Sequence, residues 1–135
     1  RGRVAACDFL GAVWRQVTTA VPDGSIPVGD DPWGIAITSD GSTVVVACED
    51  DNTVHFLDTA SLTTSWHALP TSSPRDVEIA VGDATAYLPS GNIAGDDAVF
   101  VIDLATQTMV GSVTLTGASN PNVVAVAPQL VQCQL

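Results

Sequence analysis

A short motif that begins with proline occurs three times along the chain. It reads PWGIAITSDG from Pro32, PRDVEIAVGD from Pro74 and PNVVAVAPQL from Pro121, so the starts lie 42 and 47 residues apart. A second motif, an alternating strand pattern closed by aspartate, reads TVHFLDTAS and AVFVIDLAT, with a weaker copy at RVAACDFLG. Two motifs kept in the same order indicate a repeat architecture, which restricts the possible folds more than any other feature of the sequence.

Each full unit contains four short strand patterns separated by turn signals such as Asp40-Gly41 and Gly82-Asp83. Four strands in 42 to 47 residues are typical of one β-propeller blade. A single blade cannot bury both of its faces, so blades pack radially on their neighbours. We therefore predict an all-β fold of four-stranded antiparallel propeller blades, with negligible helix and with first strands at about 33–38, 75–80 and 122–127. The core between blades is predicted at six positions of one parity, namely Ile35, Ile37, Val77, Ile79, Val124 and Val126.

The motifs divide the chain into parts of blades. Residues 1–31 would hold two late strands of one blade and the connection to the next, 32–73 and 74–120 two complete blades, and 121–135 one or two early strands of a further blade. Closed propellers have about four to eight blades, so the chain is an incomplete arc of a larger propeller. Either a longer protein or several copies complete the ring, and we expect the former. Both flanks should then be buried against protein, one at Val4, Ala6 and Val13 and the other at Val124, Val126 and Val131.

The residues resemble the YVTN-type β-propeller repeat of bacteria and archaea. The resemblance covers roughly residues 3–128 and is strongest in the first full unit, at 26–29 (IPVG), 39–41 (SDG), 52–54 (NTV) and 57–60 (LDTA). Residues 45–48 (VVAC) stand in place of the namesake tetrapeptide. The resemblance implies a propeller, typically of seven blades and often secreted or in a surface layer. It implies no shared set of catalytic residues, and we expect an extracytoplasmic location.

The charge of the chain excludes some classes of partner. Fifteen acidic residues stand against four arginines and no lysine, which gives a net charge of −11. Binding to nucleic acid or to anionic lipid depends on basic residues, so neither partner is expected. The longest apolar runs are far shorter than the roughly 20 residues of a membrane-spanning helix.

Acidic residues gather in the loops that a propeller would present on one face. The candidate partner-binding residues are Asp30, Asp31, Trp33, Glu49, Asp50, Asp51, Asp96 and Asp97. They could bind a cationic protein partner or a divalent cation, or they could be ordinary loop residues that keep the protein soluble. The sequence has no EF-hand pattern, and no metal site is predicted.

First strands of propeller blades line the central axis, which makes Arg75, Asp76 and Glu78 candidate channel-lining residues. A carboxylate there could act as an acid or base, or form a structural ion pair with Arg75. Asp58 and Asp103 end equivalent strands, and we expect them to accept backbone hydrogen bonds from the following turn.

Other residues with reactive or aromatic side chains carry weaker signals. His55 and His67 are predicted to be surface or packing residues, and Trp14 and Trp66 either cover the blade rim or anchor a partner. Cys7 and Cys133 form a disulfide or all three cysteines are buried thiols; Cys48 is expected outside any disulfide. The sequence predicts no catalytic residue and no cofactor.

Two functions follow from this reading. The first is a non-enzymatic extracytoplasmic β-propeller scaffold or protein-interaction module that presents an acidic loop face. The alternative is part of a propeller enzyme, either a lactonase-like hydrolase or the propeller subunit of a periplasmic dehydrogenase. A fold of this kind supports binding proteins and enzymes alike.

Overall fold

The computed structural model describes residues 3–8, 11–16, 22–70, 73–91, 97–117 and 121–126, and for 3–8, 11–16 and 22–25 only the backbone is considered. The described residues form three antiparallel sheets and contain no helix. These residues therefore include no helix long and apolar enough to span a membrane. The first sheet consists of β1 (Arg3–Asp8), β2 (Gly11–Gln16) and β3 (Pro22–Ile26). The second consists of β4 (Pro32–Ile37), β5 (Thr43–Cys48), β6 (Thr53–Asp58) and β7 (Thr64–Ala68). The third consists of β8 (Glu78–Ile79), β9 (Thr85–Ser90), β10 (Ala98–Asp103) and β11 (Thr108–Thr114).

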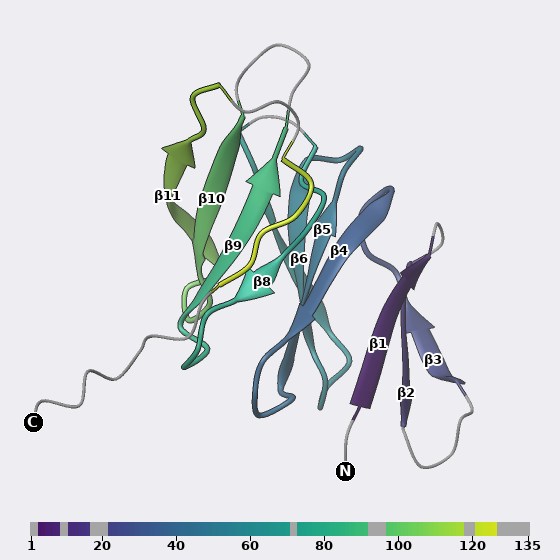
Figure 1. The fold of residues 1–135 in the computed structure, drawn as a ribbon. Helices are drawn as coiled ribbons and strands as arrows, with labels where there is room; N and C mark the ends of the chain where they lie inside the picture. The colour runs from purple at the N-terminus through teal and green to yellow at the C-terminus, as the bar shows by residue number, and fades with distance from the viewer. Residues whose placement is uncertain are drawn as a thin grey trace, which may run out of the picture.

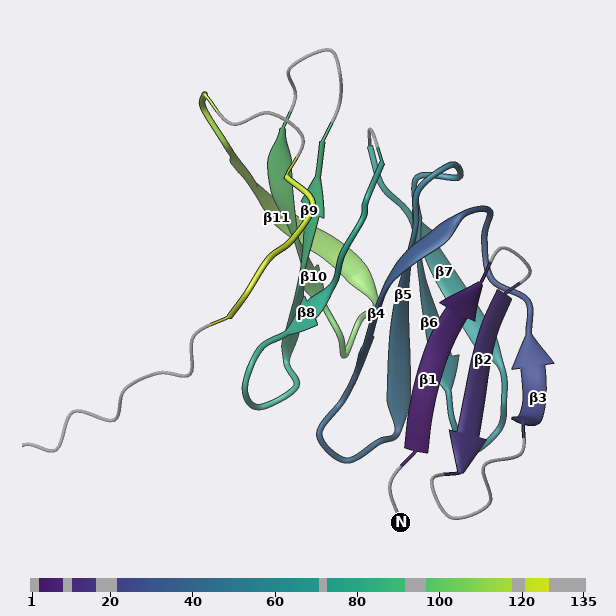
Figure 2. The same ribbon diagram turned by 45° about the vertical axis from the view of Figure 1, so that its right-hand side comes forward.

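Strands follow one another in sequence order within each sheet, as in a meander. The three sheets stand side by side in chain order, with the first and third on opposite sides of the second (Figures 1 and 2). The predicted all-β fold with four-stranded antiparallel units is confirmed for the second and third sheets.

The first sheet differs from the prediction of two late strands, because it has three. β2 pairs with both β1 and β3, and its register with β1 begins at Asp8 opposite Gly11. Only two residues separate β1 from β2, so the sequence lacks the polar loop that marks the other strand boundaries. Asp8 therefore ends a strand in a tight hairpin and is not equivalent to Asp58 and Asp103.

The predicted first strands are met to different degrees. The first coincides with β4, whereas the second is reduced to β8 and a single bridge between Pro74 and Ser90. The third is wrong for the described residues, since 121–126 form no strand. A strand exists through hydrogen bonds to a neighbour in its sheet, and the described residues after 121 include no further strand to supply them.

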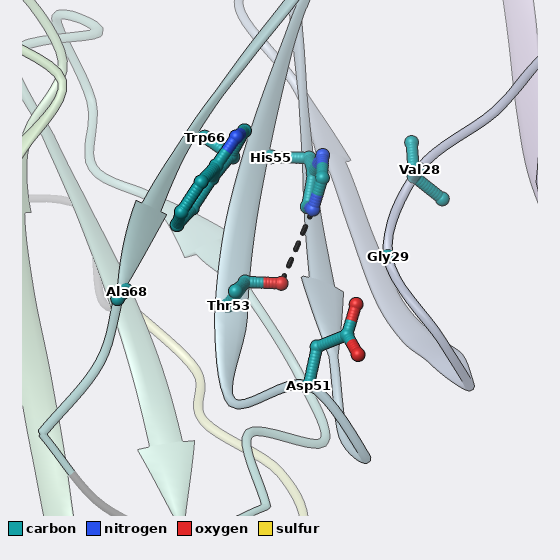
Figure 3. A pocket seen from close by; sticks show the side chains of 7 residues that line it. All are labelled: Val28, Gly29, Asp51, Thr53, His55, Trp66 and Ala68. Atoms are coloured by element: carbon teal, nitrogen blue, oxygen red, sulfur yellow. Dashed lines mark hydrogen bonds between the residues drawn. The ribbon is translucent and has the colours of Figure 1, made fainter.

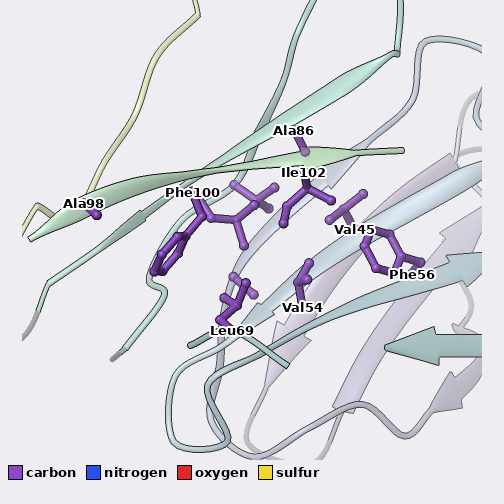
Figure 4. Packing of buried hydrophobic residues seen from close by; sticks show 11 residues of the cluster. Val45, Val54, Phe56, Leu69, Ala86, Ala98, Phe100 and Ile102 are labelled. Atoms are coloured by element: carbon purple, nitrogen blue, oxygen red, sulfur yellow. The ribbon is translucent and has the colours of Figure 1, made fainter. Parts of the chain in front are cut away.

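Two apolar clusters lie between the three sheets. The larger lies between the second and third sheets and consists of Val45, Ala47, Val54, Phe56, Leu69, Val77, Ala86, Leu88, Ala98, Phe100 and Ile102. Figure 4 shows Val45, Val54 and Phe56 facing Ala86, Phe100 and Ile102 across this boundary. The smaller cluster consists of Ile26, Val44, Val46, Cys48 and Leu57, with Val28 and Ile35 packed against it. Since successive strand residues point to opposite faces, β5 contributes to both clusters and is buried from Val44 to Cys48.

The predicted inter-blade positions of the two complete units keep the same parity. Val77 is buried in the larger cluster and Ile79 packs on it, on the side that faces the second sheet, while Ile35 packs on the smaller cluster, on the side that faces the first sheet. Each of these residues therefore faces the preceding sheet, and Ile37, the last residue of β4, is exposed. The register shift between Pro32 and Gly34 in the pairing of β4 with β5 lies before Ile35 and Ile37, which pair with Val46 and Val44 of the smaller cluster. Val124 and Val126 are half-buried, and Val4, Ala6, Val13 and Val131 lie outside the described side chains.

The first segment of each unit touches the first segment of the next unit. We call these the innermost segments, and they are β4, β8 with the residues just before it, and residues 121–126. A Cβ atom at Gly34 would lie 2.5 Å from the Asp76 Cα atom, so β4 approaches the backbone of the third sheet closely. The Asp76 Oδ2 atom in turn accepts a hydrogen bond of 3.0 Å from the Val124 backbone amide. Each innermost segment is therefore in direct contact with the next one along the chain.

Candidate functional site

The loops β3–β4 and β5–β6 bring six of the eight candidate partner-binding residues together. The Asp30 amide donates a 2.7 Å hydrogen bond to the Asp51 Oδ2 atom, and the Glu49 amide donates one of 2.8 Å to the Asp31 carbonyl. Asp30, Asp50 and Asp51 are exposed. Trp33 is 59% exposed, and its Nε1 atom donates to the Asp31 carboxylate at 2.9 Å. We call the exposed residues Asp30, Trp33, Asp50 and Asp51 the acidic loop face.

The remaining two candidates do not extend this surface in the described structure. Asp97 is only 3% exposed, and its backbone carbonyl accepts a hydrogen bond from the Leu115 amide. Asp96 lies outside the described residues. Burial of Asp97 follows from its place beside the start of β10, whose first residue belongs to the larger apolar cluster.

Arg75 forms an ion pair with Glu49, which belongs to the preceding unit. The Glu49 Oε1 atom accepts hydrogen bonds from the Arg75 Nη2 atom at 2.6 Å and from its Nε atom at 3.0 Å. The Arg75 Nη1 atom donates to the Asn122 side chain at 3.1 Å. The hydrogen bonds to Glu49 raise the pKa of Arg75. The ion pair expected for Arg75 thus exists, but it joins separate units and ties Glu49 to the structure.

Of the candidate channel-lining residues, Glu78 lies in β8, at the edge of the third sheet, and Asp76 lies two residues before it. Both are half-buried, and Asp76 is occupied by the hydrogen bond from Val124. Glu78 lies opposite Tyr87 in the register of β8 and β9. The carboxylate of Asp76 therefore holds the next innermost segment in place.

The carboxylates of Asp58 and Asp103 stabilise the turns that follow their strands, as the sequence predicts. The Asp58 Oδ1 atom accepts hydrogen bonds from the Ala60 amide at 2.9 Å and the Ser61 amide at 2.7 Å. The Asp103 Oδ1 atom accepts one of 2.7 Å from the Thr106 amide. These hydrogen bonds lower the pKa of both carboxyl groups.

A groove on the second sheet was not anticipated from the sequence. Its described lining consists of Val28, Gly29, Asp51, Thr53, His55, Trp66 and Ala68, around a volume of about 450 Å³. In Figure 3 the side chains of Thr53, His55 and Trp66 stand on one side of β6 and β7, opposite Val28 and Gly29. We call this site the Trp66 groove.

His55 and Trp66 are directly opposed in the register of β6 and β7. The His55 Nε2 atom shares a 3.1 Å hydrogen bond with the Thr53 hydroxyl, and its buried Nδ1 atom has no partner among the described residues. Burial lowers the pKa of His55, although the negative charge of Asp51 opposes this. The imidazole is therefore neutral at pH 7.

Neither the histidines nor the cysteines form an evident reactive centre within the described ranges. No group of three or more His, Cys, Asp or Glu residues there could hold a metal ion. Cys48 lies buried at the end of β5 in the smaller apolar cluster. The side chain of Cys7 and the whole of Cys133 lie outside the described residues, so the disulfide expectations stay predictions.

Comparison with known proteins supports the fold and leaves the family open. No protein-family model matches the chain, and no curated protein matches it. Hydrazine synthase of Kuenenia stuttgartiensis is similar in structure, with a TM-score of 0.80 and 25% identity over 86% of this chain and 35% of that chain. A functionally unknown protein of Desulfotomaculum acetoxidans DSM 771 has a TM-score of 0.67 and 22% identity over 78% of this chain and 34% of its own.

The chain therefore spans about a third of the length of these two structural neighbours. Its all-β architecture of four-stranded antiparallel units is that of β-propeller blades. From this point the three sheets are called the first, second and third blades.

Proposed function

We propose that these blades belong to a larger YVTN-type β-propeller, located outside the cytoplasm, that serves as a scaffold and binds a protein partner through the acidic loop face. The motifs at residues 26–29, 39–41 and 57–60 support the repeat type, and the repeat type supports the location. One observation supports the scaffold role. Several exposed carboxylates lie together on two loops that are hydrogen-bonded to each other.

Further blades of the same propeller are the proposed neighbours of the third blade. Val110 and Val113 on β11 are 62% and 58% exposed, and Val123 is 77% exposed. Apolar side chains exposed to this extent indicate a surface that other protein covers. The structural neighbours are about three times as long as the matched segment, which supports additional blades as the occupant of this side.

A basic protein segment is the proposed partner of the acidic loop face. Asp30, Asp50 and Asp51 are exposed, and the net charge of −11 attracts cations over a longer range. Trp33 adds an exposed aromatic surface, and aromatic residues are enriched where proteins bind one another. The face combines attraction at a distance with a site for close contact.

Binding of a synthetic peptide of alternating arginine and serine tests this role. The variant that combines Asp30→Asn with Asp50→Asn should weaken binding by about tenfold or more at an ionic strength of roughly 0.15 M, where screening acts beyond about 8 Å. The control combines Asp40→Asn with Asp83→Asn, which removes the same charge from the turns β4–β5 and β8–β9. Equal losses in both variants, measured by fluorescence anisotropy, would show attraction to the net charge alone and reject the proposed face.

Participation in an enzyme is the second candidate, favoured by the similarity to a hydrazine synthase. In that case the blades would form part of a lactonase-like hydrolase or of the propeller subunit of a periplasmic dehydrogenase. Metal analysis and an absorption spectrum of the native particle separate the candidates. A stoichiometric metal held by three or more His, Asp or Glu residues on the propeller axis would favour the enzyme.

A further inference from the structure

We propose that the Trp66 groove binds the guanidinium group of arginine, which stacks on the Trp66 indole and pairs with the Asp51 carboxylate. This site goes beyond the acidic loop face, with which it shares only Asp51. It lies on the side of the second blade that faces the first blade. Its occupant is an arginine in a partner polypeptide or free arginine, which present the same cation.

Comparison of two equivalent strands shows that the groove replaces an apolar contact. Thr53, His55 and Leu57 on β6 occupy the places of Ala98, Phe100 and Ile102 on β10, counted from the strand-ending Asp58 and Asp103. The three β10 residues are buried in the larger apolar cluster. Of Thr53, His55 and Leu57, only Leu57 belongs to an apolar cluster, which leaves Thr53 and His55 to line the groove. The second blade thus has polar groups where the third blade has inter-blade packing.

The wall formed by Trp66 suits a flat cation. Its side chain is 63% exposed although it borders a groove, so an aromatic face is available to a ligand. A cation over an indole is attracted by the negative face of the aromatic ring. Guanidinium is planar and more weakly hydrated than ammonium, and it stacks on aromatic rings. These properties favour arginine over lysine.

The polar groups that line the groove include a carboxylate and carry no positive charge that would repel a cation. Asp51 is held in place because its Oδ2 atom accepts the Asp30 amide hydrogen bond, and within the described ranges no hydrogen bond occupies its Oδ1 atom. Carboxylate and guanidinium form strong charge-assisted hydrogen bonds. The neutral His55 adds no positive charge that would repel the ligand, and its unpartnered Nδ1 atom marks a polar position that the described residues leave unsatisfied.

Gly29 gives the groove its width beside Asp51. A Cβ atom there would lie 2.5 Å from the Asp51 Oδ2 atom and 2.9 Å from the Thr53 Oγ1 atom. A side chain at this position would therefore displace the carboxylate that receives the ligand. The absence of a side chain keeps Asp51 next to the strand pair that carries His55 and Trp66.

The test is an NMR titration of the full chain, followed through the indole N–H signals, with acetylated arginine amide and with free arginine. Acetylated citrulline amide, which is neutral and of similar shape, is the ligand control. Arginine amide should bind at least about fivefold more tightly than citrulline amide, since only the first has the charge that the indole and carboxylate attract.

Matched variants locate the binding. Trp66→Ala and Asp51→Asn should each weaken it by about 2- to 30-fold, which corresponds to one cation–aromatic or charge-assisted contact. Asp40→Asn and Asp83→Asn each remove a carboxylate from a turn outside both the groove and the acidic loop face, and they should leave the affinity within about twofold.

Several results would overturn the proposal. Equal affinity for citrulline amide would show that the cation is not recognised. Equal losses in the matched control variants would show attraction to the net charge, and no saturable shift of the Trp66 signal would show that the groove is not a site. Tighter binding of free arginine than of arginine amide would support the groove and identify a small-molecule source. Loss of peptide binding in the Asp30/Asp50 variant with intact arginine binding would separate this site from the acidic loop face.

Discussion

Asp58 and Asp103 occupy the same place in consecutive blades, and their carboxylates accept equivalent hydrogen bonds. Each binds the backbone three residues later, at Ser61 and Thr106, and also the hydroxyl of that residue. A short side chain can reach these groups only when the chain turns directly after the strand. Local chemistry of this kind is readable from the sequence.

Replacement of Asp58 by Ala should lower the unfolding free energy at neutral pH and flatten its acid dependence. The hydrogen bonds lower the folded pKa of Asp58 below that of the unfolded chain, which is about 3.9. The stabilisation is therefore complete above pH of about 4 to 5 and disappears as the pH falls through the folded pKa. Urea unfolding followed by circular dichroism over this range measures the effect. Asp50→Ala, on an exposed turn, is the control; the same loss in both variants would reject the turn-stabilising role.

Glu49 and Arg75 should show energetic coupling between blades. Their contact includes two hydrogen bonds, and the side chains are 13% and 30% exposed. We expect a double-mutant cycle with Glu49→Gln and Arg75→Met to give a coupling of about 1–2 kcal/mol in chemical unfolding. A coupling close to zero would mean that the ion pair fixes the positions of the two side chains without adding net stability.

At the scale of single strands, the backbone of β4 approaches the next blade closely at Gly34. Gly34 faces the Asp76 backbone, and the atoms that a Cβ would meet belong to the main chain and cannot rotate away. The register shift in the pairing of β4 with β5 lies directly before this residue. The strand thus sets the spacing of the two blades.

Gly34→Ala should destabilise the protein by about 1–3 kcal/mol, because the backbone of the third blade must move to admit the methyl group. Gly111→Ala on β11 is the matched control, since a Cβ there would meet no atom within 4 Å. Urea denaturation of the two variants gives the comparison. Equal stability of the two would contradict the close packing of the innermost segments.

At the scale of the whole molecule, the third blade exposes apolar side chains that further protein should cover. Val110, Val113 and Val123 are each more than half exposed. We predict that the isolated 135-residue chain self-associates or binds a hydrophobic dye, and that the native particle does neither. Light scattering with a dye-binding assay measures both properties. A cooperatively folding monomer that binds no dye would mean that the flanks need no further protein.

The strands of the two complete blades and the turns at Asp58 and Asp103 could be predicted from the sequence. Alternation along a strand and the hydrogen bonds of a turn involve residues that are close in the chain, so their signals lie in short windows. The proline-to-proline spacing then fixed the number of strands in each unit. The third strand of the first sheet, β3, was not predicted, because its sequence contains proline, aspartate and glycine, which are typical of turns.

Only the tertiary structure decided which distant residues meet. The partner of Arg75 lies 26 residues away in another blade, and the Trp66 groove joins two strands to the loops that follow β3 and β5. The described residues after Pro121 form no strand in the absence of a paired neighbour. These features depend on how the sheets stack and on which backbone groups lie opposite each other.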